Sequence, residues 1–420
     1  MPLAKALRVR RSDVVSFVGG GGKTTSMFRL ASELGAAGMR VVTTTTTHIS
    51  EDQVQFAPSF ILPERIDLLA ERLDRFGHCL IAGPPDGKGR VHGVLPELIA
   101  LLKERSDVDI IVVEADGSRS LPFKAPGTHE PVVPDITTIL VPIAGLDALG
   151  QPLDDAHVHR PEIIASLAQQ RPGSLVTGET VARVLSHPQG GAKQLPAGAR
   201  LVPVLNRADD ETAVPHAREI AQKLLKLAVA DSVIISAMRG EPPVRETWAP
   251  IAGVILAEGQ SMGRGSMDQL LPPKHLSLAV NVARVALEAG LDPVVAVLGR
   301  QAEEVAQALA GMPVCTIVHT HFEASRSSSV RMAIEALPER TGAAVIMAAG
   351  QPVAAAGAVR DLVRAHRRSF APACAFGFDD NFANPVLFDR SLFRELRESG
   401  REAGWRPLLE KYRDSLVIIG

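Results

Sequence analysis

The sequence predicts an α/β fold with two domains, each built around a mostly parallel β-sheet. Short runs of β-branched and aliphatic residues alternate with longer helical patterns along the chain. Strands that are apolar over their whole length and are separated by helices are typical of parallel sheets buried on both faces. The length of 420 residues also exceeds what one hydrophobic core usually supports.

In the first half, the expected strands surround a helix that follows directly after the first strand. Residues 13–18 (DVVSFV) predict this strand, and residues 24–38 (TTSMFRLASELGAAG) predict the helix. Further strands are expected at 39–47, 107–117, 137–143, 200–209 and 231–237. A break with three prolines and several charges follows at 239–250. We therefore place the first domain at 1–240, a linker at 241–251 and the second domain at 252–420.

The second half repeats the alternation of strands and helices. A strand is expected from Gly253, followed by a glycine-rich turn and a helix at 275–290. Strands are then expected at 293–299, 314–320 and 343–349. The C-terminal segment SLVIIG either finishes a strand or extends into a neighbouring subunit. The roughly 170 residues of this half are a typical length for one domain.

Composition narrows the class of protein. The net charge of −2 gives no electrostatic argument for a nucleic-acid or membrane partner. No apolar stretch reaches the roughly 18 residues that a membrane-spanning helix needs. The three cysteines are far apart, which favours neither a disulfide framework nor a zinc site. We expect a cytoplasmic protein.

The segment VVSFVGGGGKTT, residues 14–25, is the strongest functional motif. A strand that ends in glycines and continues into a helix leaves free backbone N–H groups, which bind phosphate. The standard phosphate loop has the spacing G-x-x-x-x-G-K-[ST], but here its first position falls on Phe17, so the loop is shorter. A glycine turn without a ligand is the alternative. The candidate nucleotide-binding residues are Gly19, Gly20, Gly21, Gly22, Lys23, Thr24 and Thr25.

Two carboxylates follow a buried strand in the segment IIVVEADGS. Glu114 and Asp116 stand at its end, before Gly117. A carboxylate at the tip of a hydrophobic strand beside a phosphate loop is a common Mg²⁺ position. We therefore expect Thr24, Glu114 and Asp116 to hold the metal, and Lys23, Glu114 and Asp116 to be the catalytic group. Solvated acids at a strand end are the alternative.

Two further stretches bear on the ligand. In LNRAD, Asn206 and Asp209 have the N-[KR]-x-D spacing that reads guanine, although both residues are also common in turns. The run of threonines from Thr43 to Thr47 suits a strand by propensity. Either it is an edge strand, or its end with His48 lies at the carboxyl edge of the sheet near the phosphates. His48 is then an option for a metal ligand or general base.

Taken in order, these motifs resemble the YqeC family of selenium-dependent hydroxylase accessory proteins over about the first 240 residues. The matching pieces are Val18–Thr25, Thr44–His48, Glu114–Ser118, Lys124–Pro126, His129–Pro131, His159–Glu162 and the Asn206 turn. The short glycine loop is then the family's own form. The resemblance implies a P-loop-like NTP-binding protein connected with the maturation of molybdenum hydroxylases.

The second half opens with GVILAEGQSMGRGSMDQLLP at residues 253–272, and SRSSSVRMAIEAL, NPVLF and GWRPLLEKY follow at 325–337, 384–388 and 404–412. These segments are similar to those of the MobA-like nucleotidyltransferases, which include the molybdenum cofactor cytidylyltransferases. The similarity implies a Rossmann-like nucleotidyltransferase-type fold, with a candidate ligand site at Gly259, Ser261, Arg264 and Asn384. The charged positions of the family motif differ. Asp268 stands where the family has a lysine, and Gly350 where it has a metal-binding aspartate. Gly263 replaces an arginine, and Glu402 lies near, but out of register with, a further aspartate. These differences imply a catalytically degenerate domain.

Three functions follow from these observations. The first is an NTP-binding accessory protein that uses Mg²⁺ with ATP or GTP, hydrolyses it slowly, and binds a molybdopterin-type cofactor, a nucleotide or a molybdenum hydroxylase client through its second domain. The second is an active molybdenum cofactor nucleotidyltransferase. The third is a scaffold in which neither domain catalyses a reaction.

Overall fold

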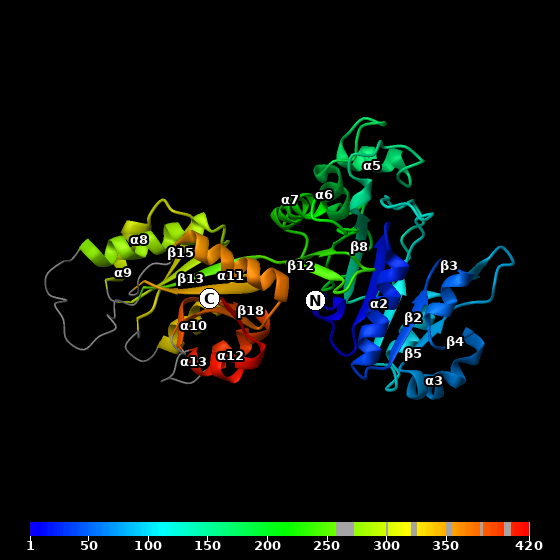
Figure 1. Ribbon diagram of the computed structural model, residues 1–420, viewed down its shortest axis with the longest axis horizontal. Helices are drawn as coiled ribbons and strands as arrows, with labels where there is room; N and C mark the ends of the chain where they lie inside the picture. Colours follow the sequence, from blue (N-terminus) through cyan, green and yellow to red (C-terminus); the bar gives the residue numbers. More distant parts are fainter. Residues whose placement is uncertain are drawn as a thin grey trace. The chain divides into compact units, whose positions relative to one another are not determined.

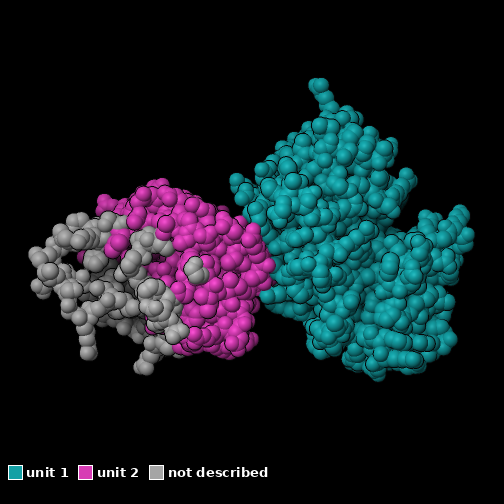
Figure 2. All heavy atoms as spheres, viewed as in Figure 1, with its two compact units in different colours: residues 1–248 teal, residues 249–420 magenta. Residues whose placement is uncertain are grey.

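The computed structural model describes residues 1–257, 273–299, 301–320, 326–349, 355–378, 381–398 and 405–419. The chain divides into two compact units, Met1–Trp248 and Ala249–Gly420 (Figure 2). Both units are α/β, and both contain a mostly parallel sheet, as the sequence predicts.

The first unit is built on a ten-stranded sheet. Its strand order is β12-β11-β10-β8-β1-β7-β2-β5-β4, with β9 beside β8. All neighbours are parallel except β11 and β12. The strands are β1 (Val14–Gly19), β2 (Val41–Thr45), β4 (Phe60–Ile61), β5 (His78–Ile81), β7 (Ile110–Glu114), β8 (Ile139–Gly145), β9 (Arg200–Leu201), β10 (Val204–Asn206), β11 (Val233–Ser236) and β12 (Val244–Trp248). A separate pair consists of β3 (His48–Ser50) and β6 (Arg90–His92).

Helices cover both faces of this sheet. They are α1 (Leu3–Ala6), α2 (Lys23–Ala36), α3 (Leu69–Phe76), α4 (Pro96–Lys103), α5 (Pro161–Ala168), α6 (Gly178–Ser186) and α7 (Ala213–Lys226). The helix α2 packs against β1, β2 and β7. Figure 1 shows α2 close to β2. Because side chains alternate along a strand, Phe17 packs in one core cluster with Met27 and Leu30, whereas Val18 joins the other cluster with Leu73.

The strand order places the predicted site at one edge of the sheet. The strand β1 lies between β7 and β8, and β2 lies on the other side of β7. Glu114 is in register with Phe17 of β1 and with Thr45 of β2. The carboxyl ends of these parallel strands therefore meet, and this edge is where open α/β sheets bind ligands.

The threonine run is not an edge strand, so that interpretation of it is wrong. The strand β2 is an interior strand, and Thr43, Thr44 and Thr45 are fully buried. The Thr43 hydroxyl lies 2.9 Å from His78 Nε2, and the Thr44 hydroxyl donates to the Ile81 carbonyl at 2.7 Å. Each hydroxyl finds a partner inside the sheet, which is the condition for burying it.

Most of the predicted linker is not a linker. Residues 244–248 form β12, which closes the first sheet beside β11, and Ile251 begins the first strand of the second unit. The segment looks polar because it contains Glu246, but this carboxylate is buried. It accepts hydrogen bonds from Arg218 Nε at 3.1 Å and from Trp248 Nε1 at 2.9 Å. Pairing of a charged residue inside the fold was not visible from composition.

The second unit has a seven-stranded sheet in the order β15-β14-β13-β16-β18-β17-β19. Only β18 runs antiparallel to its neighbours in this described sheet. The strands are β13 (Ile251–Ala257), β14 (Val294–Leu298), β15 (Val314–Val318), β16 (Ala343–Ala348), β17 (Ala373–Phe378), β18 (Asn381–Asp389) and β19 (Val417–Ile419). The helices are α8 (Pro273–Glu288), α9 (Ala302–Leu309), α10 (Arg326–Glu335), α11 (Ala356–Ser369), α12 (Phe393–Glu398) and α13 (Arg406–Lys411).

The C-terminal segment finishes a strand, because β19 pairs with β17 in its own sheet. The interpretation that SLVIIG finishes a strand is therefore the one that the structure confirms. Within the described ranges, no helix combines the length and the apolar character that crossing a membrane would require.

Candidate functional site

The glycine loop between β1 and α2 is tightly held by its surroundings. The amide of Gly19 donates to both Asp116 carboxylate oxygens, at 3.1 and 3.0 Å. The amide of Gly20 donates to the Ile143 carbonyl at 2.9 Å, and that of Gly21 to the Leu121 carbonyl at 3.1 Å. These three amides thus have acceptors within the protein.

The next four amides differ. Among the residues that the structure describes, none accepts a hydrogen bond from the amide of Gly22, Lys23, Thr24 or Thr25. These groups lie at the start of the 14-residue helix α2, and Gly22, Thr24 and Thr25 are half-buried. Free N–H groups at the positive end of a helix dipole attract an anion. The amides of the loop that have no acceptor among the described residues therefore lie at its helical end.

Lys23 is buried beside the two predicted carboxylates. Its Nζ donates to the Gly19 carbonyl at 2.7 Å. The same atom lies 3.4 Å from Asp116 Oδ1 and 3.7 Å from Glu114 Oε1. The side chain of Lys23 is 3% exposed. The structure therefore brings the glycine loop, the lysine and both acids together at the edge of the sheet.

Glu114 is linked to α2 by a second contact. The Thr24 hydroxyl donates to Glu114 Oε2 at 2.7 Å. Burial raises the pKa of Glu114, and this outweighs the lowering by the nearby Lys23 ammonium and the Thr24 hydrogen bond. Thr24 and Glu114 thus present hard oxygen atoms next to the free amides.

A row of paired charges extends from this site, consisting of Asp116, Lys124, Glu130 and Arg160. Lys124 Nζ lies 3.0 Å from Asp116 Oδ2 and donates to Glu130 Oε2 at 2.7 Å. Arg160 Nη1 donates to the same Glu130 oxygen at 2.7 Å. No sequence motif predicts a role for these three residues, although each falls in a segment that carries the resemblance. Their pairing joins residues 30 positions apart (Glu130 and Arg160), which local patterns cannot reveal.

Glu130 makes the stability of the first unit dependent on pH. Burial would raise its pKa, but the hydrogen bonds from Arg160 and Lys124 prevail and lower it from 4.5 to about 2. Ionised Glu130 therefore stabilises the folded state above the unfolded pKa, by up to about 3 kcal/mol. This contribution disappears as the pH falls from about 4.5 towards 2. We expect wild type to exceed Glu130→Gln in free energy of unfolding at pH 7, with the gap closing near pH 2.5, as measured by urea denaturation.

The matched control for this pH effect is the exposed Glu64. Its replacement by glutamine is expected to leave the free energy of unfolding within about 0.5 kcal/mol of wild type at both pH values. A gap between wild type and Glu130→Gln that stays constant between pH 7 and pH 2.5 would contradict the role given to this carboxylate.

Asn206 and Asp209 lie in different surroundings. Asn206 is buried, its Nδ2 donates to the Gly21 carbonyl at 2.7 Å, and its Oδ1 accepts from Met238 N at 3.1 Å. Asp209 is exposed on the turn after β10. Asn206 therefore holds the glycine loop, and of the two residues only Asp209 has its side chain in solvent.

His48 stands apart from the buried carboxylates and faces another histidine. It is exposed at the start of β3, and its Nε2 lies 3.2 Å from His92 Nδ1. Burial lowers the pKa of His48, with further lowering by Arg90 and His92.

No group of three or more His, Cys, Asp or Glu side chains is placed to hold a metal within the part of the chain that the structure describes. Carboxylate and imidazole groups of the described residues alone therefore do not complete a metal site at Glu114.

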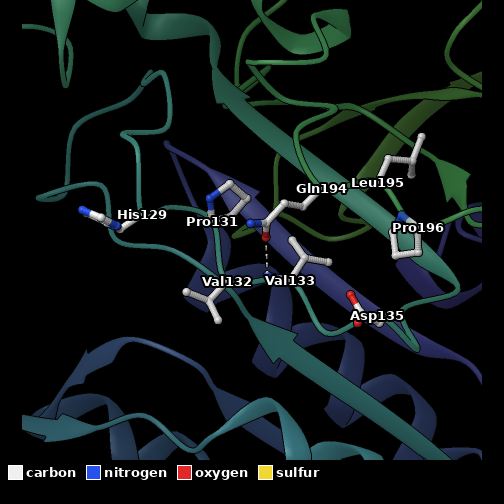
Figure 3. A pocket seen from close by; sticks show the side chains of 8 residues that line it. All are labelled: His129, Pro131, Val132, Val133, Asp135, Gln194, Leu195 and Pro196. Atoms are coloured by element: carbon white, nitrogen blue, oxygen red, sulfur yellow. Dashed lines mark hydrogen bonds between the residues drawn. The ribbon is translucent and has the colours of Figure 1, made fainter.

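A cavity of about 430 Å³ is lined by residues on either side of Glu130 in sequence. Figure 3 shows its lining side chains. The cavity is lined by His129, Pro131, Val132, Val133, Asp135, Gln194, Leu195 and Pro196. The Val133 amide donates to Gln194 Oε1 at 3.1 Å across it. His129 and Pro131 flank Glu130 in sequence, so one wall of the cavity is anchored by the pairs of Glu130 with Lys124 and Arg160.

In the second unit, most of the predicted ligand site lies outside the described residues. This applies to Gly259, Ser261 and Arg264. It also applies to the positions that imply lost catalysis, namely Gly263, Asp268, Gly350 and Glu402. Asn384 lies on β18, and its Oδ1 accepts from Ala348 N at 3.1 Å. The cavity beside it measures about 10 Å³, room for roughly one water molecule.

Each of the two units matches a known protein family. The family model for "YqeC protein" matches residues 15–162. The uncharacterized protein YqeC of Escherichia coli (strain K12) is 34% identical over 198 residues, which are 47% of this chain and 77% of that protein. The chain belongs to the YqeC family. This YqeC family member also carries a "MobA-like NTP transferase domain" at residues 253–416. Both resemblances predicted from the sequence are confirmed.

Two solved structures similar to this YqeC family member each align with 40% of its chain. Rv0371c from Mycobacterium tuberculosis H37Rv is 28% identical, with a TM-score of 0.33 and 87% of that chain covered. A nucleotidyl transferase from Methanothermobacter is 22% identical, with a TM-score of 0.34 and 87% of that chain covered.

Proposed function

We propose that the first unit binds a nucleoside triphosphate with Mg²⁺ at the N-terminus of α2 and serves as an NTP-dependent accessory protein in the maturation of molybdenum hydroxylases. The observation that carries the proposal is the set of four amides without acceptors in the described structure, Gly22 to Thr25, beside a buried lysine. A triphosphate offers oxygens to these amides and a negative charge to Lys23. Membership of the YqeC family and the NTP transferase domain support a nucleotide-related role.

The cation would be held by the Thr24 hydroxyl and the Glu114 carboxylate. Both are hard oxygen donors, which Mg²⁺ prefers, and they already lie 2.7 Å apart. Mg²⁺ in proteins commonly takes one or two carboxylates and completes its octahedron with substrate phosphates and water. Asp116 is occupied by the Gly19 amide and Lys124, so we give it a positioning role for the loop.

The base would be recognised near the turn after β10. Asp209 is exposed there and could accept hydrogen bonds from a guanine, whereas Asn206 supports the loop through Gly21. ATP and GTP both stay within the proposal. We propose slow hydrolysis because Glu114 and Asp116 are both paired with Lys23 in this state and neither is a free base.

The second unit would bind a molybdopterin-type cofactor, a nucleotide or the client enzyme without catalysing transfer. This part of the proposal depends on the acidic residue at Asp268 and the glycine at Gly350, where related enzymes have a lysine and a metal-binding aspartate. A negative charge close to the phosphates would disfavour their binding.

A nucleotide panel tests the proposal on the full chain. At constant Mg²⁺, ATP or GTP is expected to raise the apparent stability of wild type by about 2.7 kcal/mol at roughly 100 times its dissociation constant. In Lys23→Ala this nucleotide-dependent rise is expected to disappear, because the buried ammonium that meets the phosphates is gone. The measurement is the unfolding temperature with and without nucleotide, together with phosphate release.

The matched control is Lys88→Ala, which removes the same charge from an exposed position. It should keep the nucleotide-dependent rise. A rise of equal size in Lys23→Ala would contradict binding at α2. If wild type binds GTP more tightly than ATP, loss of that difference in Asp209→Ala would show that Asp209 recognises guanine.

The MobA-like domain match favours one second candidate, a molybdenum cofactor nucleotidyltransferase. This activity would release pyrophosphate from CTP or GTP when molybdopterin is present. Pyrophosphate release that persists in Lys23→Ala would assign the reaction to the second unit and replace the accessory function proposed above.

A further inference from the structure

The ammonium of Lys23 occupies a place suited to a cation. Oxygen atoms approach it from Gly19, Asp116 and Glu114, at 2.7, 3.4 and 3.7 Å. The side chains of Lys23, Glu114 and Asp116 are all at least nine-tenths buried. The oxygen donors that surround it, carboxylate and carbonyl, are of the kind that bind Mg²⁺ or Mn²⁺.

The two carboxylates do not depend on Lys23 equally. Asp116 is paired with Lys124 at 3.0 Å and accepts the Gly19 amide. For Glu114, Lys23 is the one ion-pair partner among the described residues, and Thr24 adds a neutral hydrogen bond. A buried carboxylate without a positive neighbour is costly. Departure of Lys23 would therefore leave Glu114 as the carboxylate in need of a cation.

We propose that Lys23 and a divalent cation exclude one another at Glu114, so that the cation enters when a phosphate draws Lys23 away. The role of phosphate rests on the function proposed above. The Lys23 ammonium and a divalent cation would both lie within a few ångströms of the buried Glu114 carboxylate, so they would repel each other strongly. The anion and the cation therefore bind cooperatively, and Lys23 keeps the site closed to a cation that arrives alone. The free amides of α2, next to the Lys23 backbone, supply the place to which the anion is attracted.

This coupling predicts a gain of binding on removing a lysine. In Lys23→Met, without nucleotide, Mn²⁺ is expected to bind the full chain more tightly than wild type, by a factor within the usual range of coupling, about 5- to 150-fold. The measurement is titration calorimetry with MnCl₂. The added substitution Glu114→Gln should abolish the gain, because the carboxylate that receives the cation is then neutral.

Lys88→Met is the matched control. It changes the net charge equally at an exposed position, so it should bind Mn²⁺ as wild type does. If Lys23 merely forms a structural ion pair, Lys23→Met will fold, as judged by circular dichroism, and gain no Mn²⁺ binding. That result overturns the inference.

If Lys23→Met fails to fold, a second variant tests the coupling through nucleotide binding instead of Mn²⁺ binding. Neutral Glu114→Gln holds Lys23 less firmly and should bind ATP or GTP in EDTA several-fold more tightly than wild type. Equal or weaker binding overturns the inference. Failure of wild type to bind any nucleotide, with Mn²⁺ binding gained in Lys23→Met, refutes the proposed function and leaves the exclusion at Glu114 intact.

Discussion

Replacing Gly21 with alanine is expected to destabilise the first unit by about 3–5 kcal/mol, the sum of backbone strain and overpacking. Gly21 has φ +82°, which side chains rarely adopt. A Cβ there would lie 2.5 Å from Gly145 N and 2.7 Å from Pro122 O. Both are backbone atoms of other segments, so neither can rotate away. The free energy of unfolding in urea measures the loss.

Gly38 provides the matched control for Gly21. It has nearly the same backbone angle, φ +80°, but a Cβ there would meet nothing within 4 Å. Gly38→Ala therefore carries the conformational strain alone, about 1–2 kcal/mol. Equal losses in the two variants would refute the claim that close backbone packing, rather than conformation alone, requires glycine in the loop.

Replacing Asp116 with asparagine is expected to destabilise the first unit by about 3–5 kcal/mol, as breaking a buried ion pair usually does. Asp116 is 1% exposed and lies between the ammonium groups of Lys23 and Lys124. A neutral amide leaves both buried charges without this counter-ion. It also loses one of the oxygens that accept the Gly19 amide. Urea denaturation of the full chain, followed by circular dichroism, measures the change.

Asp135→Asn is the control for Asp116→Asn, because it neutralises an exposed aspartate in the same unit. It is expected to change the free energy of unfolding by no more than about 0.5 kcal/mol. If Asp116→Asn also stays within about 1 kcal/mol of wild type, the contacts of Asp116 with the Gly19 amide, Lys23 and Lys124 do not stabilise the loop.

Much of the fold and part of the site could be predicted from local patterns. The expected strand at 13–18 is β1, and the helix expected after the glycines is α2, which begins at Lys23. Glu114 ends β7 as expected. These features depend on side-chain periodicity and on glycine, which act over a few residues. The linker prediction was wrong because burial of Glu246 depends on Arg218, 28 residues earlier.

Residue identity alone determined that this chain has two α/β units and that a glycine loop, a lysine and two acids stand at strand ends. Only the tertiary structure decided how they are used. By placing β1 between β7 and β8, it directs the amides of Gly19 and Gly20 to Asp116 and Ile143 and leaves the helical amides free. It also turns Lys23 towards Glu114. Such choices depend on which strands become neighbours, because hydrogen bonds and ion pairs act over a few ångströms in space, whatever the separation along the chain.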